Sequence, residues 1–254
     1  MKLVVLGDPV DHSRSPAIQT AALEACGIDG TYTARRVDPA GMVSAVDEVR
    51  YGRLSGANVT MPHKQLAFEL VDRVSETALR SEAVNTLVRR DGEVWGYNTD
   101  VDGIQAVWES ASLPKDRPVL ILGAGGAAAG VVGAMADRTI VVSGRRDRAA
   151  AELLERTRGE GSIVPWGTPV EGAVVVNATP IGMNAEPLPG AVLEGASGFF
   201  DLTYGPVESP SVRYARDLGI PIADGKELLL AQAAVSFEIW TRIPAPIDVM
   251  RAAF

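Results

Sequence analysis

The sequence predicts an α/β fold in two domains. Short apolar runs such as Leu3–Leu6 and Val119–Leu122 end at a glycine, and a segment with helical spacing of apolar residues follows each of them. Buried strands that alternate with such helices are typical of α/β proteins with largely parallel sheets. A chain of 254 residues is also long enough to bury two modest cores. We therefore expect an N-terminal α/β domain and a second α/β domain after it.

The composition excludes several classes of function. The formal net charge is −8, which does not favour a surface for duplex nucleic acid, because phosphate binding needs clustered positive charge. No apolar run approaches the roughly 20 residues of a membrane span, and the N-terminal segment resembles a first strand more than a signal peptide. The single cysteine, Cys26, fits a reducing compartment. We expect a cytoplasmic protein, a monomer or homodimer, that acts on a small molecule.

The first strand leads into a loop with two serines. Ser15 followed by Pro16 predicts a helix start, with Ser15 as the N-cap and Pro16 at the first helical position. Ser13 and Ser15 would then stand beside free backbone N–H groups, a suitable seat for a carboxylate. Simple capping remains the competing interpretation for Ser15. Ser13 has no predicted capping role, so the pair favours a ligand site.

The next elements bring a lysine to a helix start. Thr31–Val37 is a predicted strand, Pro39–Val49 a helix and Ala57–Met61 a third strand. Pro62 is expected to open the following helix, which places Lys64 in its first turn. The positive end of the helix macrodipole disfavours a cation there, so Lys64 is a candidate functional residue. An ordinary exposed lysine is the alternative.

A predicted hairpin leads to a candidate carboxylate. Val84–Arg90 and Glu93–Tyr97 flank an Asp-Gly pair, the strongest short-range signal for a hairpin turn. Asp100 follows at the start of a helix, where Asp102 competes with it as the N-cap. One interpretation is that Asp100 is only the N-cap. If Asp102 caps the helix instead, Asp100 is free to face a ligand together with the amine of Lys64. Small polar residues near the strand ends surround this pair: Asn58, Thr60, Asn85, Asn98 and Thr99.

The second domain begins with a glycine-rich turn. Ser112–Pro118, with two prolines and three charges, is the predicted linker. After it, the strand Val119–Leu122 leads into Gly-Ala-Gly-Gly-Ala-Ala from Gly123 to Ala128 and then a helix of small residues. This G-x-G-x-x-A pattern between strand and helix predicts a Rossmann-like dinucleotide-binding domain, with the pyrophosphate at the helix N-terminus.

The end of the next strand indicates which dinucleotide binds. An NAD enzyme usually has an acidic residue there for the ribose 2′-hydroxyl, but the strand Thr139–Val142 is followed by Arg145 and Arg146. Because a guanidinium matches a phosphate in shape and charge, the sequence favours NADP. A solvated basic helix start, which Asp147 supports, is the alternative.

The remaining segments continue the alternation of strands and helices. Further strands are expected near Ile163 and at Val174–Val176, Phe199–Leu202 and Pro221–Ala223, with helices between them. A long helix is expected from Lys226 to about Trp240, and a short one that holds Ile247 and Met250 closes the chain. Gln232 interrupts the apolar stripe of the long helix, as a surface accident or as a ligand contact.

Several of these segments together resemble the shikimate dehydrogenase family. They occur in the family's order and span nearly the whole chain: HSRSP at His12, GANVTMPHK at Gly56, AVNT at Ala83, GYNTDVDG at Gly96, GAGGA at Gly123, NATPIGM at Asn177, DLTYGP at Asp201 and ADGKELLLAQAAVSFEIW at Ala223.

The resemblance implies a reversible, NADP-dependent reduction of 3-dehydroshikimate to shikimate in aromatic amino-acid biosynthesis, without a metal. It implies Lys64 and Asp100 as the catalytic pair. Ser13 and Ser15 would hold the substrate carboxylate, and the other substrate contacts would be Thr60, Lys64, Asn85, Asp100, Gln232 and the nearby Tyr204. The cofactor contacts would be Gly123, Ala124, Gly125, Gly126, Ala127, Arg145, Arg146, Glu76, Leu202 and Gly225.

The family's domain arrangement would place residues 1–100 and 225–254 in a substrate domain and 101–224 in an NADP domain, with the active site in the cleft between them. The chain departs from the family pattern at Gly144–Arg146 and at Glu82, where the family has glycine. Three alternatives remain: a quinate/shikimate dehydrogenase that uses NAD, a non-catalytic paralogue that binds substrate or cofactor, and a methylene-tetrahydrofolate dehydrogenase. A folate would leave the two serines of HSRSP unexplained.

Overall fold

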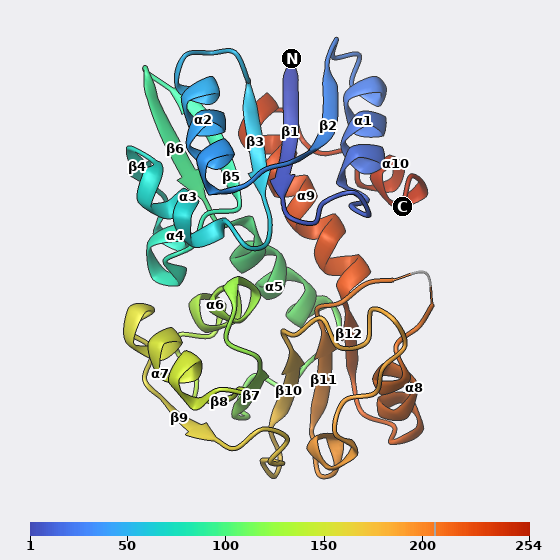
Figure 1. The fold of residues 1–254 in the computed structure, drawn as a ribbon. Coiled ribbons are helices and arrows are strands. Elements are labelled where there is room, and N and C mark those ends of the chain that lie inside the picture. The colour runs from blue at the N-terminus through green and yellow to red at the C-terminus, as the bar shows by residue number, and fades with distance from the viewer. Residues whose placement is uncertain (206) are drawn as a thin grey trace. The chain divides into compact units, whose positions relative to one another are not determined.

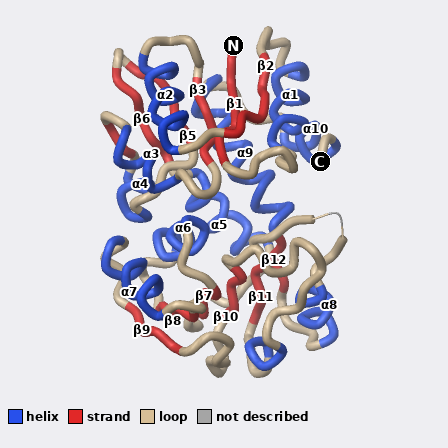
Figure 2. The backbone as a smooth tube through the Cα atoms, viewed as in Figure 1, coloured by secondary structure: helices blue, strands red, loops and turns tan. Residues whose placement is uncertain are grey.

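Two six-stranded sheets organise the chain in the computed structural model, which describes residues 1–205 and 207–254 (Figure 1). Each sheet belongs to its own compact unit: residues 1–103 with 229–254 form the first, and residues 104–228 the second. Helices accompany both sheets, as Figure 2 shows, and the predicted α/β class is confirmed. The predicted segment Asp201–Pro206 ends at Pro206, which lies outside the described residues.

The first unit contains a mixed sheet in the order β2-β1-β3-β5-β6-β4. Its strands are β1 (Lys2–Gly7), β2 (Thr31–Arg36), β3 (Gly56–Val59), β4 (Arg73–Val74), β5 (Thr86–Arg90) and β6 (Glu93–Tyr97). Its helices are α1 (Ser15–Ala25), α2 (Pro39–Arg50), α3 (Lys64–Leu70), α4 (Glu76–Ser81), the start of α5 (Thr99–Ser110), most of α9 (Gly225–Thr241) and α10 (Ile247–Ala252). The strands β1, β2 and β3 are parallel, and β5 pairs antiparallel with both β3 and β6.

The predicted hairpin is confirmed between β5 and β6. Asp91 and Gly92 have φ angles of 51° and 86°, and a two-residue turn with positive φ at both positions matches the twist of the strands it joins. The short strand β4 was not expected from the sequence.

Strand alternation gives the first sheet two different faces. Ala57, Val59 and Leu87 join the apolar cluster beneath α2. Their neighbours Asn58 and Thr86 point to the opposite face, as successive strand residues do, and their side chains hydrogen-bond to Ser236 of α9. The face toward α9 is therefore polar at its centre.

The second unit is an all-parallel sheet in the order β12-β11-β10-β7-β8-β9. Its strands are β7 (Val119–Leu122), β8 (Ile140–Ser143), β9 (Gly161–Val164), β10 (Val174–Asn177), β11 (Gly198–Asp201) and β12 (Ile222–Asp224). Its helices are α6 (Gly126–Ala134), α7 (Asp147–Arg156), η1 (Gly190–Leu193) and α8 (Pro210–Asp217). Read from β9, the order is 3-2-1-4-5-6, the dinucleotide-binding arrangement, and it reverses between β7 and β10.

The predicted linker at Ser112–Pro118 is wrong as a domain boundary. The two units divide inside α5, between Gly103 and Ile104, and residues 112–118 belong to the second unit. Leu113 is buried, and the carbonyl oxygen of Pro114 accepts hydrogen bonds from Trp108 and Arg138. The prolines and charges of this segment therefore belong to a packed loop, since the side chain of Leu113 is buried and the carbonyl group of Pro114 is hydrogen-bonded.

Candidate active site

Lys64 and Asp100 form an ion pair in the first unit. The Nζ atom of Lys64 lies 2.5 Å from Oδ2 of Asp100, and the two side chains are 16% and 14% exposed. Both residues lie at the start of a helix: Lys64 is the first residue of α3, and Asp100 is the second residue of α5. The pair is thus shielded from bulk water, and its charges interact more strongly than those of a surface pair.

The helix starts differ from the expected ones. Pro62 does not open α3: it follows a cis peptide bond, and His63 precedes the first helical residue. Neither Asp100 nor Asp102 is an N-cap, because α5 already begins at Thr99, and the side chain of Asn98 accepts the N–H of Asp100 (3.2 Å). The carboxylate of Asp100 is therefore left for Lys64.

Asp102 lies two residues after Asp100 in the chain. Burial raises its pKa, the negative charge of Asp100 adds to that effect, and the positive charge of Arg80 opposes it. The first turn of α5 thus carries two carboxyl groups in different surroundings.

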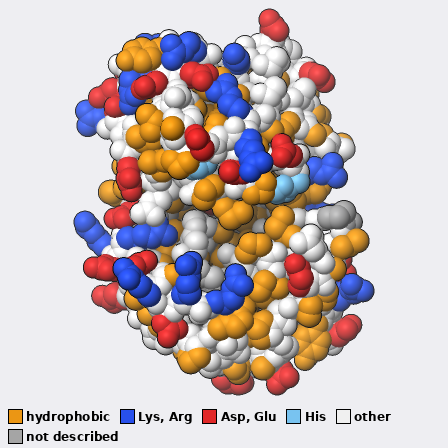
Figure 3. All heavy atoms as spheres, in the orientation of Figure 1, with side chains coloured by type: hydrophobic (Ala, Val, Ile, Leu, Met, Phe, Trp, Pro, Cys, Tyr) orange, Lys and Arg blue, Asp and Glu red, His pale blue; other side chains and the backbone are white. Residues whose placement is uncertain are grey.

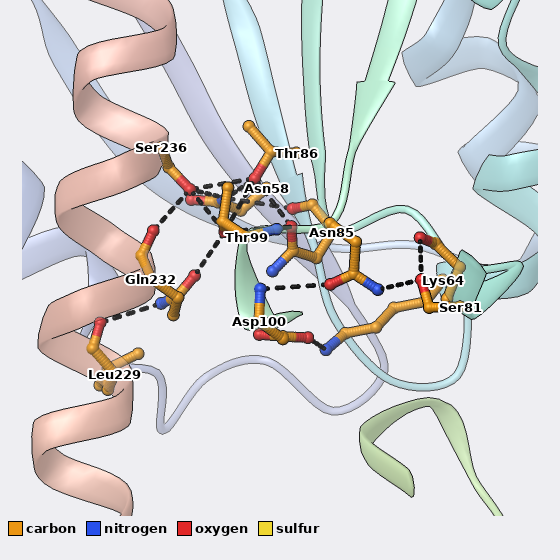
Figure 4. A network of polar contacts seen from close by, with 12 residues as sticks. Asn58, Lys64, Ser81, Asn85, Thr86, Thr99, Asp100, Leu229, Gln232 and Ser236 are labelled. Atoms are coloured by element: carbon orange, nitrogen blue, oxygen red, sulfur yellow. Dashed lines mark hydrogen bonds and ion pairs between the residues drawn. The ribbon is translucent and has the colours of Figure 1, made fainter. Parts of the chain in front are cut away.

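Asn85 is a buried amide whose oxygen is fully engaged. Its Oδ1 atom accepts from the N–H of Thr99 (2.8 Å) and from the hydroxyls of Thr86 (2.9 Å) and Thr99 (3.1 Å). Its Nδ2 atom donates to no group within the described residues. Figure 4 shows Asn85 between the Lys64–Asp100 pair and the hydroxyl cluster. The geometry makes this amide nitrogen available to a ligand oxygen.

Gln232 lies on the face of α9 toward the same cluster. It is buried, its Nε2 donates to the carbonyl oxygen of Leu229 (3.1 Å), and its Oε1 accepts from the hydroxyl of Thr99 (3.4 Å) (Figure 4). The polar break in the helix is therefore not a surface accident.

Thr60 follows β3 directly, and its side-chain hydroxyl has no partner among the described residues. Its N–H donates to the carbonyl oxygen of Leu6 (2.8 Å). A Cβ atom at Gly7 would lie 2.3 Å from Cγ2 of Thr60, so the glycine permits this close approach of the two strand ends.

The two serines before α1 are arranged differently from the prediction. Ser15 is the first residue of the helix and Arg14 its N-cap, which makes no side-chain capping bond. The hydroxyl of Ser13 accepts a hydrogen bond from the N–H of Ser15 (3.3 Å). Ser13 therefore pairs with a backbone N–H at the helix start, which the sequence did not predict. No hydrogen bond in the described part of the chain joins either serine to Lys64 or Asn85.

The glycine-rich turn of the second unit lies at the reversal point of its strand order. Gly123 has a φ of +115°, and a Cβ atom there would lie 2.9 Å from the carbonyl oxygen of Ala178. Gly125 is the N-cap of α6, and a Cβ atom there would meet nothing within 4 Å. The residues at this turn therefore fit a dinucleotide: the glycines keep the space in front of the helix N-terminus open, where the N–H groups favour a pyrophosphate.

The side chains of Arg145 and Arg146 are exposed and have no ion-pair partner within the described residues. Arg148, by contrast, pairs with Glu152 at 2.7 Å. Basic side chains of this unit gather over α6 and α7 on the face seen in Figure 3. The two free guanidinium groups just after β8 suit a phosphate at that strand end.

The other predicted cofactor residues divide between the two units. Leu202 and Gly225 meet in the second, where a Cβ atom at Gly225 would lie 2.7 Å from the carbonyl oxygen of Leu202. Tyr204 is half-buried in the loop after β11. Glu76 is exposed on α4 of the first unit, 3.9 Å from Arg80.

Three polar residues of the sites were missed by sequence analysis. Thr86 and Ser236 belong to the hydroxyl cluster, and their signal was a small polar residue on an otherwise apolar strand or helix face. Asp201 is the third: its Oδ1 accepts from Asn177 (2.9 Å) and from the N–H and hydroxyl of Thr203 (3.0 and 2.8 Å). Burial raises the pKa of Asp201, against these hydrogen bonds.

Among residues 1–205 and 207–254, no group of three or more His, Cys, Asp or Glu side chains is arranged to hold a metal ion. No helix in the same residues is both long and apolar enough to cross a membrane.

Comparison with known proteins shows which family the chain resembles. Residues 5–87 match the model of the shikimate dehydrogenase substrate binding domain, and residues 225–253 that of the shikimate 5'-dehydrogenase C-terminal domain. Shikimate dehydrogenase (NADP(+)) of Desulforamulus reducens is 37% identical over 97% of this chain and 92% of its own, and that of Archaeoglobus fulgidus 38% identical over 99% and 96%. The crystal structure of shikimate 5-dehydrogenase from Thermus thermophilus in complex with NADP(H) and shikimate superposes with a TM-score of 0.88 at 33% identity, and covers 100% of this chain and 98% of that one.

Proposed function

The chain belongs to the shikimate dehydrogenase family, and we propose that it catalyses the reversible, NADP-dependent reduction of 3-dehydroshikimate to shikimate, a step of aromatic amino-acid biosynthesis. The observation that carries the proposal is the shielded pair of Lys64 and Asp100, whose charged atoms lie 2.5 Å apart. We assign the first unit to the substrate and the second to the cofactor.

NADPH, when bound, supplies the hydride that reduces the ketone carbon. The glycine turn at Gly123–Ala127 would hold its pyrophosphate, and Arg145 and Arg146 its 2′-phosphate. The open space at Gly125, the close backbone approach that Gly123 permits and the arginines without an ion-pair partner among the described residues support this assignment.

Lys64 supplies the proton in this proposal. As the ketone is reduced, negative charge develops on its oxygen, and an ammonium group within hydrogen-bonding reach both stabilises that charge and donates a proton to it. In the reverse direction the amine accepts the proton from the hydroxyl of shikimate. Asp100 holds the ammonium group in place and accepts a hydrogen bond from the substrate.

The remaining substrate contacts are assigned by chemistry. The free Nδ2 of Asn85 donates to a substrate oxygen, and Gln232 and Thr60 contact further hydroxyls. Ser13 and Ser15, at the N-terminus of α1, receive the carboxylate, which suits both the hydroxyl groups and the helix dipole. Tyr204, which belongs to the second unit, is the remaining proposed substrate contact.

A four-way initial-rate assay tests the proposal: shikimate or quinate, each with NADP or NAD, followed by the absorbance of the reduced cofactor. Dominant activity with shikimate and NADP is expected. Activity mainly with quinate or NAD would move the chain to the quinate-using branch of the family. Ligand binding without activity in all four combinations would identify a non-catalytic paralogue.

A further inference from the structure

A buried cluster of polar side chains lies directly behind Asn85 (Figure 4). Thr86, Thr99 and Ser236 are fully buried and Asn58 is 7% exposed, and they come from four elements: β3, β5, α5 and α9. Hydrogen bonds of 2.9–3.4 Å link them to one another and to Asn85. Buried polar groups of this kind are costly unless all are paired, so their donor and acceptor directions matter.

A backbone N–H fixes the orientation of the Asn85 amide. The N–H of Thr99 lies 2.8 Å from Oδ1 and can only donate. A flipped amide would place two donors against each other, at the cost of an unmade buried hydrogen bond. The oxygen of Asn85 therefore faces the cluster, and its nitrogen faces away from it as a donor.

A backbone carbonyl fixes Asn58 in the same way. The Nδ2 atom of Asn58 lies 3.0 Å from the carbonyl oxygen of Asn85, which can only accept. Its second hydrogen is then left for the hydroxyl oxygens of Thr86 (3.0 Å) and Ser236 (3.1 Å). Its Oδ1 atom accepts from the hydroxyl of Tyr32.

The proton of the Thr86 hydroxyl has two acceptors at short range. Its oxygen accepts from Asn58, and its own proton can point to Oδ1 of Asn85 at 2.9 Å or to Oγ of Ser236 at 3.0 Å. Ser236 donates its own proton to the carbonyl oxygen of Gln232 (2.9 Å) and already accepts from Asn58 (3.1 Å), so the contact to Asn85 is favoured. Thr86 therefore links the fixed amide of Asn58 to the amide of Asn85, beside the two bonds that Thr99 makes to the same oxygen.

We propose that Thr86 is a positioning residue for substrate binding, which acts through Asn85. Together with the N–H and hydroxyl of Thr99, its hydroxyl holds the amide oxygen in place, so that the amide nitrogen is aimed steadily at a substrate with an oxygen acceptor at that point. The proposal rests on the proposed function in one respect, namely that Asn85 contacts the substrate.

The kinetic test compares Thr86→Val with Thr86→Ser. Valine keeps the shape of threonine but has no hydroxyl, and Asn58 keeps partners in the Asn85 carbonyl oxygen and Ser236. We expect Thr86→Val to raise the KM for shikimate about tenfold, the cost of one lost buried hydrogen bond, with kcat and the KM for NADP changed less than about threefold. Thr86→Ser restores the hydroxyl and should restore the KM.

A double-mutant cycle asks whether Thr86 acts through Asn85. In an Asn85→Ala background, Thr86→Val should leave the KM for shikimate unchanged, because the side chain that it positions is absent. Full additivity of the two effects, or a KM in Thr86→Val equal to that of the wild type, would overturn the proposal. Thr157→Val is the matched control, since the hydroxyl of Thr157 donates only to the carbonyl oxygen of Leu153 on α7.

A second readout does not depend on activity. Relaxation of the ¹⁵N side-chain signal of Asn85, assigned by its loss in Asn85→Ala, should report a rigid amide in the wild type and in Thr86→Ser. In Thr86→Val only the two bonds from Thr99 remain, and the amide should be more mobile than in the wild type. Equal rigidity in all three would refute the positioning role. If the wild type does not turn over shikimate, the proposed function fails, while the relaxation data still decide whether Thr86 holds Asn85.

Discussion

The ammonium group of Lys64 lies 2.5 Å from the carboxylate of Asp100, although 36 residues separate them in the chain. Both residues stand in the first turn of a helix, and neither side chain caps its own helix. These two side chains are 16% and 14% exposed, whereas every other ion pair among the described residues has at least one side chain that is 34% exposed or more. A partly buried amine with a single acidic partner is suited to exchange a proton with a bound ligand.

Lys64→Ala should lower kcat by about 100- to 10,000-fold, the range that a positioned general acid contributes. Binding of NADP, measured by calorimetry, should change less than about twofold, because the glycine turn and the two arginines proposed to hold NADP belong to the other unit. Lys115→Ala removes a lysine that pairs with Glu109 at an exposed site and serves as the control. An unchanged kcat would remove Lys64 from the mechanism.

Arg145→Ala should raise the KM for NADP by about 10- to 100-fold and that for NAD by less than about twofold. One charge-assisted hydrogen bond to the 2′-phosphate contributes on the order of 1.5–3 kcal/mol, and NAD lacks this group. Arg148→Ala is the control, since Arg148 is already paired with Glu152. Equal losses with both cofactors would place the 2′-phosphate elsewhere.

Local sequence signals predicted most of the secondary structure, because strands, turns and the glycine-rich loop depend on neighbouring residues. Pro39 begins a helix as expected, and Asp91-Gly92 forms the turn of the hairpin. The capping role predicted for Ser15 was wrong, because Ser15 is already the first helical residue and the hydroxyl of Ser13 accepts its N–H. Which residue caps a helix depends on side-chain geometry that spacing does not reveal.

The site could be predicted only as far as single residues carry a chemical signal. Lys64 and Asp100 are charged residues at helix starts, and both were identified. Thr86 and Ser236 gave no such signal, because they meet only when β5 and α9 pack against each other, 150 residues apart in sequence. Strand order and register supply this information, and neither is encoded in a local pattern.

Glu82→Gly should stabilise the protein by about 1 kcal/mol. Glu82 ends α4 with a φ of 42°, a left-handed conformation that costs on the order of 1 kcal/mol for a residue with a Cβ atom and little for glycine. The midpoint of urea unfolding should therefore rise with an unchanged m-value. Glu82→Ala retains the Cβ atom and should give no such gain, and stabilisation by both variants would mean that loss of the carboxylate, not the backbone, is the cause.

Asp201→Asn should change how stability depends on pH. Burial raises the pKa of Asp201 in the folded protein. Between the ordinary pKa, about 3.9, and the raised one, the folded chain therefore holds a proton that the unfolded chain has lost. Stability conferred by this group is full below the ordinary pKa and is lost as the pH rises through the raised pKa, by at most about 1.4 kcal/mol per pH unit.

An asparagine at this position still has a side-chain oxygen that can accept the hydrogen bonds from Asn177 and Thr203, but its side chain does not titrate. The free energy of unfolding of Asp201→Asn minus that of the wild type should thus increase from pH 4 toward pH 8, whatever its value at pH 4. Chemical unfolding at several pH values measures this slope, with Asp137→Asn, at an exposed position, as the control for loss of one negative charge. A difference that stays constant or decreases with pH would show that the folded protein holds Asp201 ionised throughout.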